Sequence, residues 1–140
     1  MAKAQVKVTD TIKAPIADVW KLVEDFGGLD KIMDAVETCE TEGEGIGMLR
    51  KIPMGGSAVV ERLEECDAGK HRLAYSIIEG PLPFKDYYAV IELASEGGDT
   101  RIDWTGTFEP AGVTEDQAKQ MVNGIYSGGI KGFKSALGAG

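Results

Sequence analysis

Two carboxylates stand in the middle of strand-like runs of this chain, where an acidic side chain must face water or find a partner. They belong to Glu61 and Asp103. If both point into a cavity, they could hold water molecules, bind the polar end of a ligand, or act as a general acid and base. The alternative is that each carboxylate lies on the solvated outer face of a sheet.

Three tyrosines carry apolar rings with polar tips in the same part of the chain: Tyr75, Tyr87 and Tyr88. Such residues can orient a ligand in a pocket that makes few polar contacts, and they fit equally well as ordinary sheet residues. Methionines could line an adaptable pocket, although core filling is their commoner role. The methionines concerned are Met48, Met54 and Met121.

The remaining reactive side chains predict no metal or organic cofactor. His71, the sole histidine, stands at a turn beside Lys70 and Arg72, which favours a surface position over that of a catalytic base. Cys39 and Cys66 lack metal-type spacing and are interpreted as buried or half-buried free thiols in a reducing compartment. The glycine run at 43–47 lacks the lysine and the following helix of a phosphate-binding loop.

The connection from Gly80 to Phe84, with the sequence GPLPF, is apolar and stiff, which is unusual for a loop. Leu82 and Phe84, held by Pro81 and Pro83, must pack on something. That surface could be the body of the protein, a partner, or the mouth of a cavity.

Hydrophobic periodicity predicts the elements that carry these residues. Val6, Val8 and Ile12 alternate as in a half-buried strand, and Pro15 suits the start of a helix that ends at the glycines 27–28. A second short helix is predicted at 29–33. Six further strands are predicted at about 35–42, 46–52, 57–66, 71–79, 85–95 and 100–109.

The last segment predicts a long amphipathic helix. Thr114 and Gln117 form a capping box, and an apolar stripe follows at helical spacing. Its members are Ala118, Met121, Val122, Ile125, Gly129, Phe133 and Ala136. Each glycine inside a helix costs about 1 kcal/mol relative to alanine. The glycines at 124, 128, 129 and 132 therefore indicate either close packing of strands or volume left for a ligand.

The predicted fold is α+β, with seven antiparallel strands and one long helix to cover one face. A sheet of this extent must curl, and a curled sheet around one helix encloses space that side chains need not fill. At 140 residues the chain is predicted to form a single domain, residues 1–140.

Charge and hydropathy exclude several classes of partner. The net charge is −8 and basic residues do not cluster, which argues against nucleic acid and against an anionic membrane surface. The N-terminal residues lack an apolar signal region, and the longest apolar runs are too short to cross a bilayer. The cytoplasm is the expected location, without membrane insertion.

In this order and spacing, several short segments resemble the START-like, or helix-grip, superfamily, which includes the Bet v 1 fold. They are segments 14–20 (APIADVW), 25–29 (DFGGL), 47–50 (GMLR), 61–63 (ERL), 75–77 (YSI), 80–83 (GPLP), 103–104 (DW) and 108–110 (FEP). Within the superfamily the chain resembles the bacterial SRPBCC proteins labelled polyketide cyclase/dehydrase. The resemblance implies a seven-stranded sheet curled around the C-terminal helix, with two short helices after the first strand.

The chain is similar, more distantly, to the plant abscisic-acid receptors, which hold a small apolar acid under a gate loop and a latch loop. The gate falls on 53–56 and the latch on 80–84, where Leu82-Pro83-Phe84 replaces that family's His-Arg-Leu. The lysine that anchors a carboxylate there falls on or near Glu37, so the same anchoring is not implied here. The implied pocket wall comprises Glu61, Tyr75, Ile77, Tyr87, Asp103, Met121 and Ile125.

The orientation of Asp103 is open at this stage. Its neighbours Ile102, Trp104 and Phe108 alternate as a buried set and favour Asp103 on the outside, whereas the resemblance favours the inside. We expect the cavity side, because such a face tolerates polar groups and water. Trp104 would then stand on the outer face and need a cover, such as the partner of a homodimer.

Three functions follow from these patterns. The first is binding of a small, largely apolar ligand (a lipid, a polyketide-like or an aromatic molecule), with loops 53–56 and 80–84 as gates. Its predicted contacts are the pocket-wall residues above together with Met54, Leu82, Pro83 and Phe84. The second is a cofactor-independent cyclase or dehydrase that uses Asp103, Glu61 and a tyrosine. This interpretation is weakened because no histidine or arginine is expected in the cavity. The third is a protein-interaction module with Phe84 and Trp104 exposed.

Overall fold

The computed structural model describes residues 3–33, 36–54 and 56–138 of the chain, apart from the side chain of Met54. The chain order is strand, two short helices, six strands and a long helix. In sequence the elements are β1 (Ala4–Ile12), α1 (Ile16–Glu24), the 3-10 turn η1 (Phe26–Gly28), α2 (Leu29–Ile32), β2 (Glu40–Glu42), β3 (Leu49–Met54), β4 (Ser57–Asp67), β5 (Arg72–Glu79), β6 (Phe84–Glu96), β7 (Asp99–Pro110) and α3 (Glu115–Leu137).

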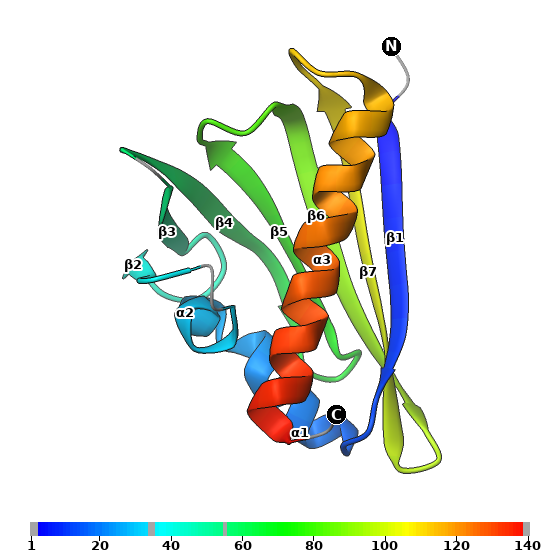
Figure 1. Cartoon of the computed structure of the whole chain (residues 1–140). Coiled ribbons are helices and arrows are strands. Elements are labelled where there is room, and N and C mark those ends of the chain that lie inside the picture. The colour runs from blue at the N-terminus through cyan, green and yellow to red at the C-terminus, as the bar shows by residue number, and fades with distance from the viewer. Residues whose placement is uncertain (1–2, 34–35, 55, 139–140) are drawn as a thin grey trace.

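The strands form one antiparallel sheet in the order β1-β7-β6-β5-β4-β3-β2. Short turns join the strands from β2 to β7, and the first strand pairs with the last, from Ala4 opposite Phe108 to Ile12 opposite Thr100. Figure 1 shows the sheet curling around α3, which crosses its concave face, while α1 and α2 lie at one end. This architecture confirms the predicted α+β helix-grip fold.

Local chemistry explains where α3 begins and ends. Thr114 accepts a hydrogen bond from the backbone N–H of Gln117, whose side chain accepts one from the N–H of Thr114, as the predicted capping box requires. Gly138 ends the helix in the left-handed conformation, with φ of 63°. Ala118, Val122 and Tyr126 are completely buried on the face of α3 that meets the sheet.

Two of the helix glycines are explained by close packing. A Cβ on Gly129 would lie 2.6 Å from the Trp104 ring, and a Cβ on Gly132 would overlap the backbone carbonyl of Ile32 in α2. Gly124, in contrast, faces open space. The glycines therefore let the sheet and α2 approach α3, which is the first of the two explanations offered by the sequence.

The predicted element boundaries differ from the structure in three places. The first helix ends at Glu24 rather than at Gly27, because residues 26–28 tighten into a 3-10 turn. Of the strand expected at 35–42, residue 35 lies outside the described residues and the rest is regular only from Glu40 to Glu42, and the next strand begins at Leu49 rather than 46. Both lie at the end of the sheet where β2 has a single neighbour, so little pairing holds their ends in place.

Candidate functional site

A cavity of about 620 Å³ lies between the concave face of the sheet, α2 and α3. Its wall is mainly aliphatic and aromatic. The lining residues are Leu29, Met33, Val36, Glu37, Arg50, Ile52, Pro53, Val59, Glu61, Tyr75, Ile77, Leu82, Phe84, Tyr87, Trp104 and Ile125. Apolar walls with a few polar groups are typical of small-molecule pockets, which range over about 300–1,000 Å³.

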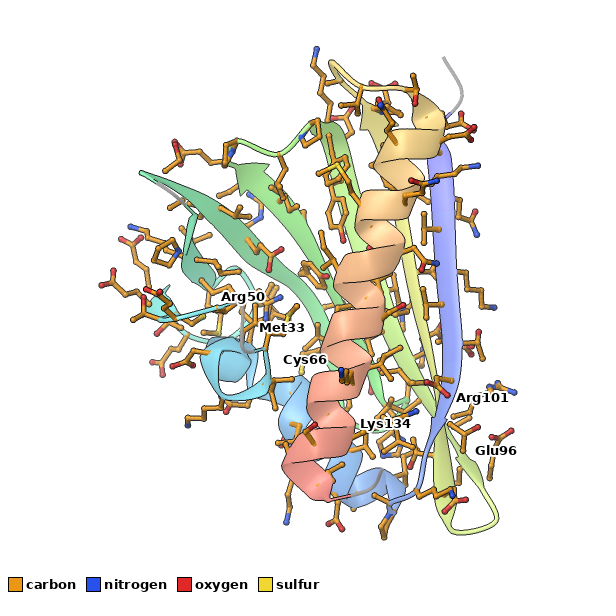
Figure 2. All side chains as sticks on the ribbon, in the orientation of Figure 1. Met33, Arg50, Cys66, Glu96, Arg101 and Lys134 are labelled. Carbon is orange, nitrogen blue, oxygen red and sulfur yellow. The ribbon has the colours of Figure 1, made fainter. Side chains whose placement is uncertain are left out.

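Arg50 and Glu61 form a buried ion pair in this wall. The Nε and Nη2 atoms of Arg50 lie 2.7 and 2.6 Å from Oε1 of Glu61, and the two side chains are 8% and 10% exposed. Nη1 donates to the backbone carbonyl of Phe26 at 3.0 Å. Figure 2 shows Arg50 near Met33, between α2 and the sheet, and both residues line the cavity.

Strand register explains why both charges point inward. Arg50 of β3 pairs directly opposite Glu61 of β4. Glu61 alternates with the buried residues Val59 and Leu63, so a period of two places it on the concave face. The Arg50 guanidinium also stacks over the Phe26 ring, 3.9 Å from its centroid. Buried charges need this kind of pairing, because desolvation opposes an isolated one.

A second polar group in the interior is a cluster of three phenols. The hydroxyls of Tyr87 on β6 and Tyr126 on α3 are hydrogen bonded, and Tyr75 accepts a hydrogen bond from the indole nitrogen of Trp104 at 3.2 Å. Tyr126 stacks on Trp104 with ring centroids 4.7 Å apart. Burial raises the pKa of Tyr75, Tyr87 and Tyr126, so all three phenols stay neutral in the folded protein.

These raised pKa values predict loss of stability in alkaline solution. An unfolded chain ionises its tyrosines near their ordinary pKa of about 10, while the folded protein holds these three protonated. Stability from the three phenols is therefore complete below pH ~10 and falls as the pH rises above it. Spectrophotometric titration should show the phenolate signal of three of the four tyrosines rising together with unfolding. Reversible ionisation of all four in the folded protein would contradict this prediction.

Comparison with known proteins identifies the family. Residues 3–138 match the family described as "Polyketide cyclase / dehydrase and lipid transport". The chain belongs to this family.

Solved structures of similar proteins agree with the assignment. The XoxI protein of Bacillus cereus is 26% identical and superposes with a TM-score of 0.86 over 95% of this chain and 94% of its own. A putative uncharacterized protein from Bacillus thuringiensis is 27% identical, with a TM-score of 0.85 over 95% of this chain and 98% of its own. Ara h 8.0201, at 20% identity and a TM-score of 0.82 over 99% of both chains, shares the fold.

Most of the pocket residues predicted from the sequence line the cavity of this member of the family. They are Glu61, Tyr75, Ile77, Leu82, Phe84, Tyr87 and Ile125. Pro83 is not among the lining residues, and its carbonyl instead accepts a hydrogen bond from the N–H of Ala111. Met121 is 40% exposed on α3 and does not line the cavity. Met54 ends β3, but its side chain lies outside the described part of the chain.

The expected inward orientation of Asp103 is wrong. Its carboxylate accepts a hydrogen bond from the hydroxyl of Thr9 on the neighbouring strand at 2.7 Å and lies 3.4 Å from Nε of Arg101. Trp104 points inward instead and is 3% exposed, so it needs no cover from a dimer partner. The alternation of Ile102, Trp104 and Phe108 was the correct signal, because side chains of one strand alternate between faces.

Two polar groups of the interior were not predicted from the sequence: Arg50, which lines the cavity, and Tyr126, which lies in the core behind it. Arg50 contradicts the expectation that the cavity holds no arginine, and Tyr126 supplies the third phenol. The alternation of Arg50 with the buried Ile52 was a usable signal for the first. Tyr126 directly follows Ile125 in the helical stripe and lies four residues after Val122, so helical spacing already indicated a buried position.

The other predicted reactive residues lie outside the cavity. His71 is half-buried in the turn directly before β5, where its ring meets the Trp20 ring edge-on with the ring centroids 5.7 Å apart. Cys39 is half-buried as expected, whereas Cys66 is exposed near the end of β4. Phe84 and Trp104 do not form an exposed patch, which removes the basis of the interaction-module interpretation.

Two general properties bear on the site. Across residues 3–33, 36–54 and 56–138, histidine, cysteine, aspartate and glutamate side chains form no group of three that could hold a metal ion. Within the same described ranges, the helices are too short or too polar to span a bilayer.

Proposed function

We propose that this protein binds a small, largely apolar molecule in the cavity between the sheet and α3. The observation that carries the proposal is the cavity itself: about 620 Å³ with a mostly apolar wall, in a protein of this size. An unfilled apolar space of this size forgoes many packing contacts, and an apolar ligand would restore them. The family description, which includes lipid transport, supports this ligand class.

Entry to the cavity would involve the segment 80–84. Leu82 and Phe84 line the cavity, and the segment is fixed to the start of the loop before α3 by the bond between Ala111 and Pro83. The ligand would pass when this apolar segment moves away from the cavity mouth. The second predicted gate, 53–56, contains residue 55, which lies outside the described residues.

Ligand binding can be tested with the neutral fluorophore prodan, whose emission shifts to the blue in an apolar site. We expect saturable, stoichiometric binding to the wild-type protein. Ile125→Trp should weaken binding by about tenfold or more, because the larger ring fills the cavity that Ile125 lines.

Met121→Trp is the matched control. It places the same ring one helical turn earlier on α3, at a residue that is 40% exposed, and should change affinity by less than about twofold. Thermal unfolding of both variants checks that they are folded. Equal binding by the two variants, or no saturable binding by the wild-type protein, would overturn the proposed function.

A further inference from the structure

We infer that the cavity selects neutral ligands that carry a hydrogen-bond donor, such as an aromatic or aliphatic hydroxyl, and discriminates against carboxylates. The inference rests on the proposed function and adds the chemical class of the ligand. It follows from the way in which Arg50 and Glu61 use their polar atoms, and from the charges around the cavity.

Each of the three guanidinium nitrogens of Arg50 already contacts a group of the protein. Two of its nitrogens contact Glu61, and the third donates to the carbonyl of Phe26. Its guanidinium lies 3.9 Å from the centroid of the Phe26 ring and 5.0 Å from that of Tyr75. A ligand carboxylate would have to displace Glu61 to form the two-point contact that arginine prefers with carboxylates.

In contrast, one carboxylate oxygen of Glu61 makes no hydrogen bond to the described residues. Both contacts from Arg50 fall on Oε1, and the described residues provide no partner for Oε2. The Glu61 side chain is 10% exposed and lines the cavity, so a group that enters the cavity can reach this oxygen. This oxygen is not shut off in the interior, because the one shielded side-chain polar atom without a partner among the described residues is Trp20 Nε1. A carboxylate oxygen that is open to an apolar cavity favours a ligand that donates a hydrogen bond to it.

The charges of the cavity wall also disfavour a carboxylate ligand. Among its described lining residues, Arg50 carries the positive charge, while Glu61 and Glu37 are acidic. The phenols of Tyr75 and Tyr87 are neutral, so neither counts as a charge. A carboxylate ligand would therefore meet a wall with an excess of negative charge, in a protein whose net charge is −8.

Three probes of similar size and different polar groups test the inference. 2-Naphthol is neutral and donates a hydrogen bond, 2-methoxynaphthalene is neutral without a donor, and 2-naphthoate is a carboxylate near neutral pH. Competition with prodan gives their affinities for the wild-type protein. We expect 2-naphthol to bind about tenfold more tightly than 2-methoxynaphthalene and at least about tenfold more tightly than 2-naphthoate.

Two variants assign the selectivity to Glu61. Glu61→Gln should reduce the preference for 2-naphthol over 2-naphthoate by about tenfold or more, because it removes the charged acceptor and leaves Arg50 without its counter-ion. Glu64→Gln is the matched control on the same strand, since Glu64 bonds Arg62 and Ser76 away from the cavity. It should retain the wild-type order of affinities.

The outcomes separate the inference from the proposed function. Equal binding of the three probes by the wild-type protein, or preference for 2-naphthoate, would overturn the inference and leave ligand binding in place. Failure of prodan and of all three probes would overturn both. If Glu61→Gln does not fold, the order of affinities in the wild-type protein still decides the question.

Discussion

Arg50→Met is expected to lower the free energy of unfolding by about 3–5 kcal/mol, the range observed when one partner of a buried ion pair is removed. Methionine has a similar length, so the change removes the charge and the hydrogen bonds more than the volume. Glu61 would remain 8% exposed without a cation, and the carbonyl of Phe26 would lose its donor. Urea denaturation followed by circular dichroism measures the loss.

Two further variants make this prediction specific. Arg50→Met combined with Glu61→Leu should recover much of the lost stability, because replacing both partners by apolar groups of similar shape leaves no buried charge. Arg62→Met is the surface control: Arg62 pairs with Glu64 while 46% exposed, and its loss should change stability by about 1 kcal/mol or less. A double variant less stable than Arg50→Met would show that the penalty does not arise from an unpaired Glu61.

Gly132→Ala is expected to destabilise the protein by about 2 kcal/mol, in spite of the better helix propensity of alanine. The new methyl group would overlap the carbonyl oxygen of Ile32 and lie 2.8 Å from its Cγ2 atom. Backbone cannot rotate away as a side chain can, so α2 must shift away from α3. Because α2 carries Leu29 and precedes Met33, both in the cavity wall, prodan binding should weaken as well.

Gly124→Ala provides the control on the same helix. A Cβ at Gly124 has nothing within 4 Å, so the substitution should stabilise the protein by about 1 kcal/mol through helix propensity alone. Chemical denaturation of the two variants should therefore give shifts of opposite sign. Stabilisation by both substitutions would mean that α2 and α3 are not packed as closely as described.

Local sequence patterns were sufficient to predict the fold. The alternation in β1, the capping box at Thr114 and the turns between the strands each depend on residues close together in sequence. These patterns, with the order of the elements, predict an antiparallel sheet around one helix. The boundaries were least accurate around β2, where few neighbours hold the chain in place.

The candidate site was predicted only in part, because it depends on side chains from distant segments. Helical periodicity and the family resemblance both placed Ile125 toward the interior, whereas Ile77 and Tyr87 were placed there by the resemblance, and all three line the cavity. Strand periodicity applied strictly would have placed Asp103 outside, where the structure has it. The resemblance to a ligand-binding family led to the opposite expectation for Asp103. For a single strand, alternation was the more reliable guide, since it follows directly from backbone geometry.

The amino-acid sequence by itself determined the elements, their order, the face that each one buries, and hence the class of fold. Only the tertiary structure decided which polar groups meet: Arg50 with Glu61 across two strands, and Tyr87 with Tyr126 between sheet and helix. The physical reason is that hydrogen bonds and ion pairs depend on distances of a few ångströms between side chains. Those distances are set by strand register and by the close approach that Gly129 and Gly132 allow.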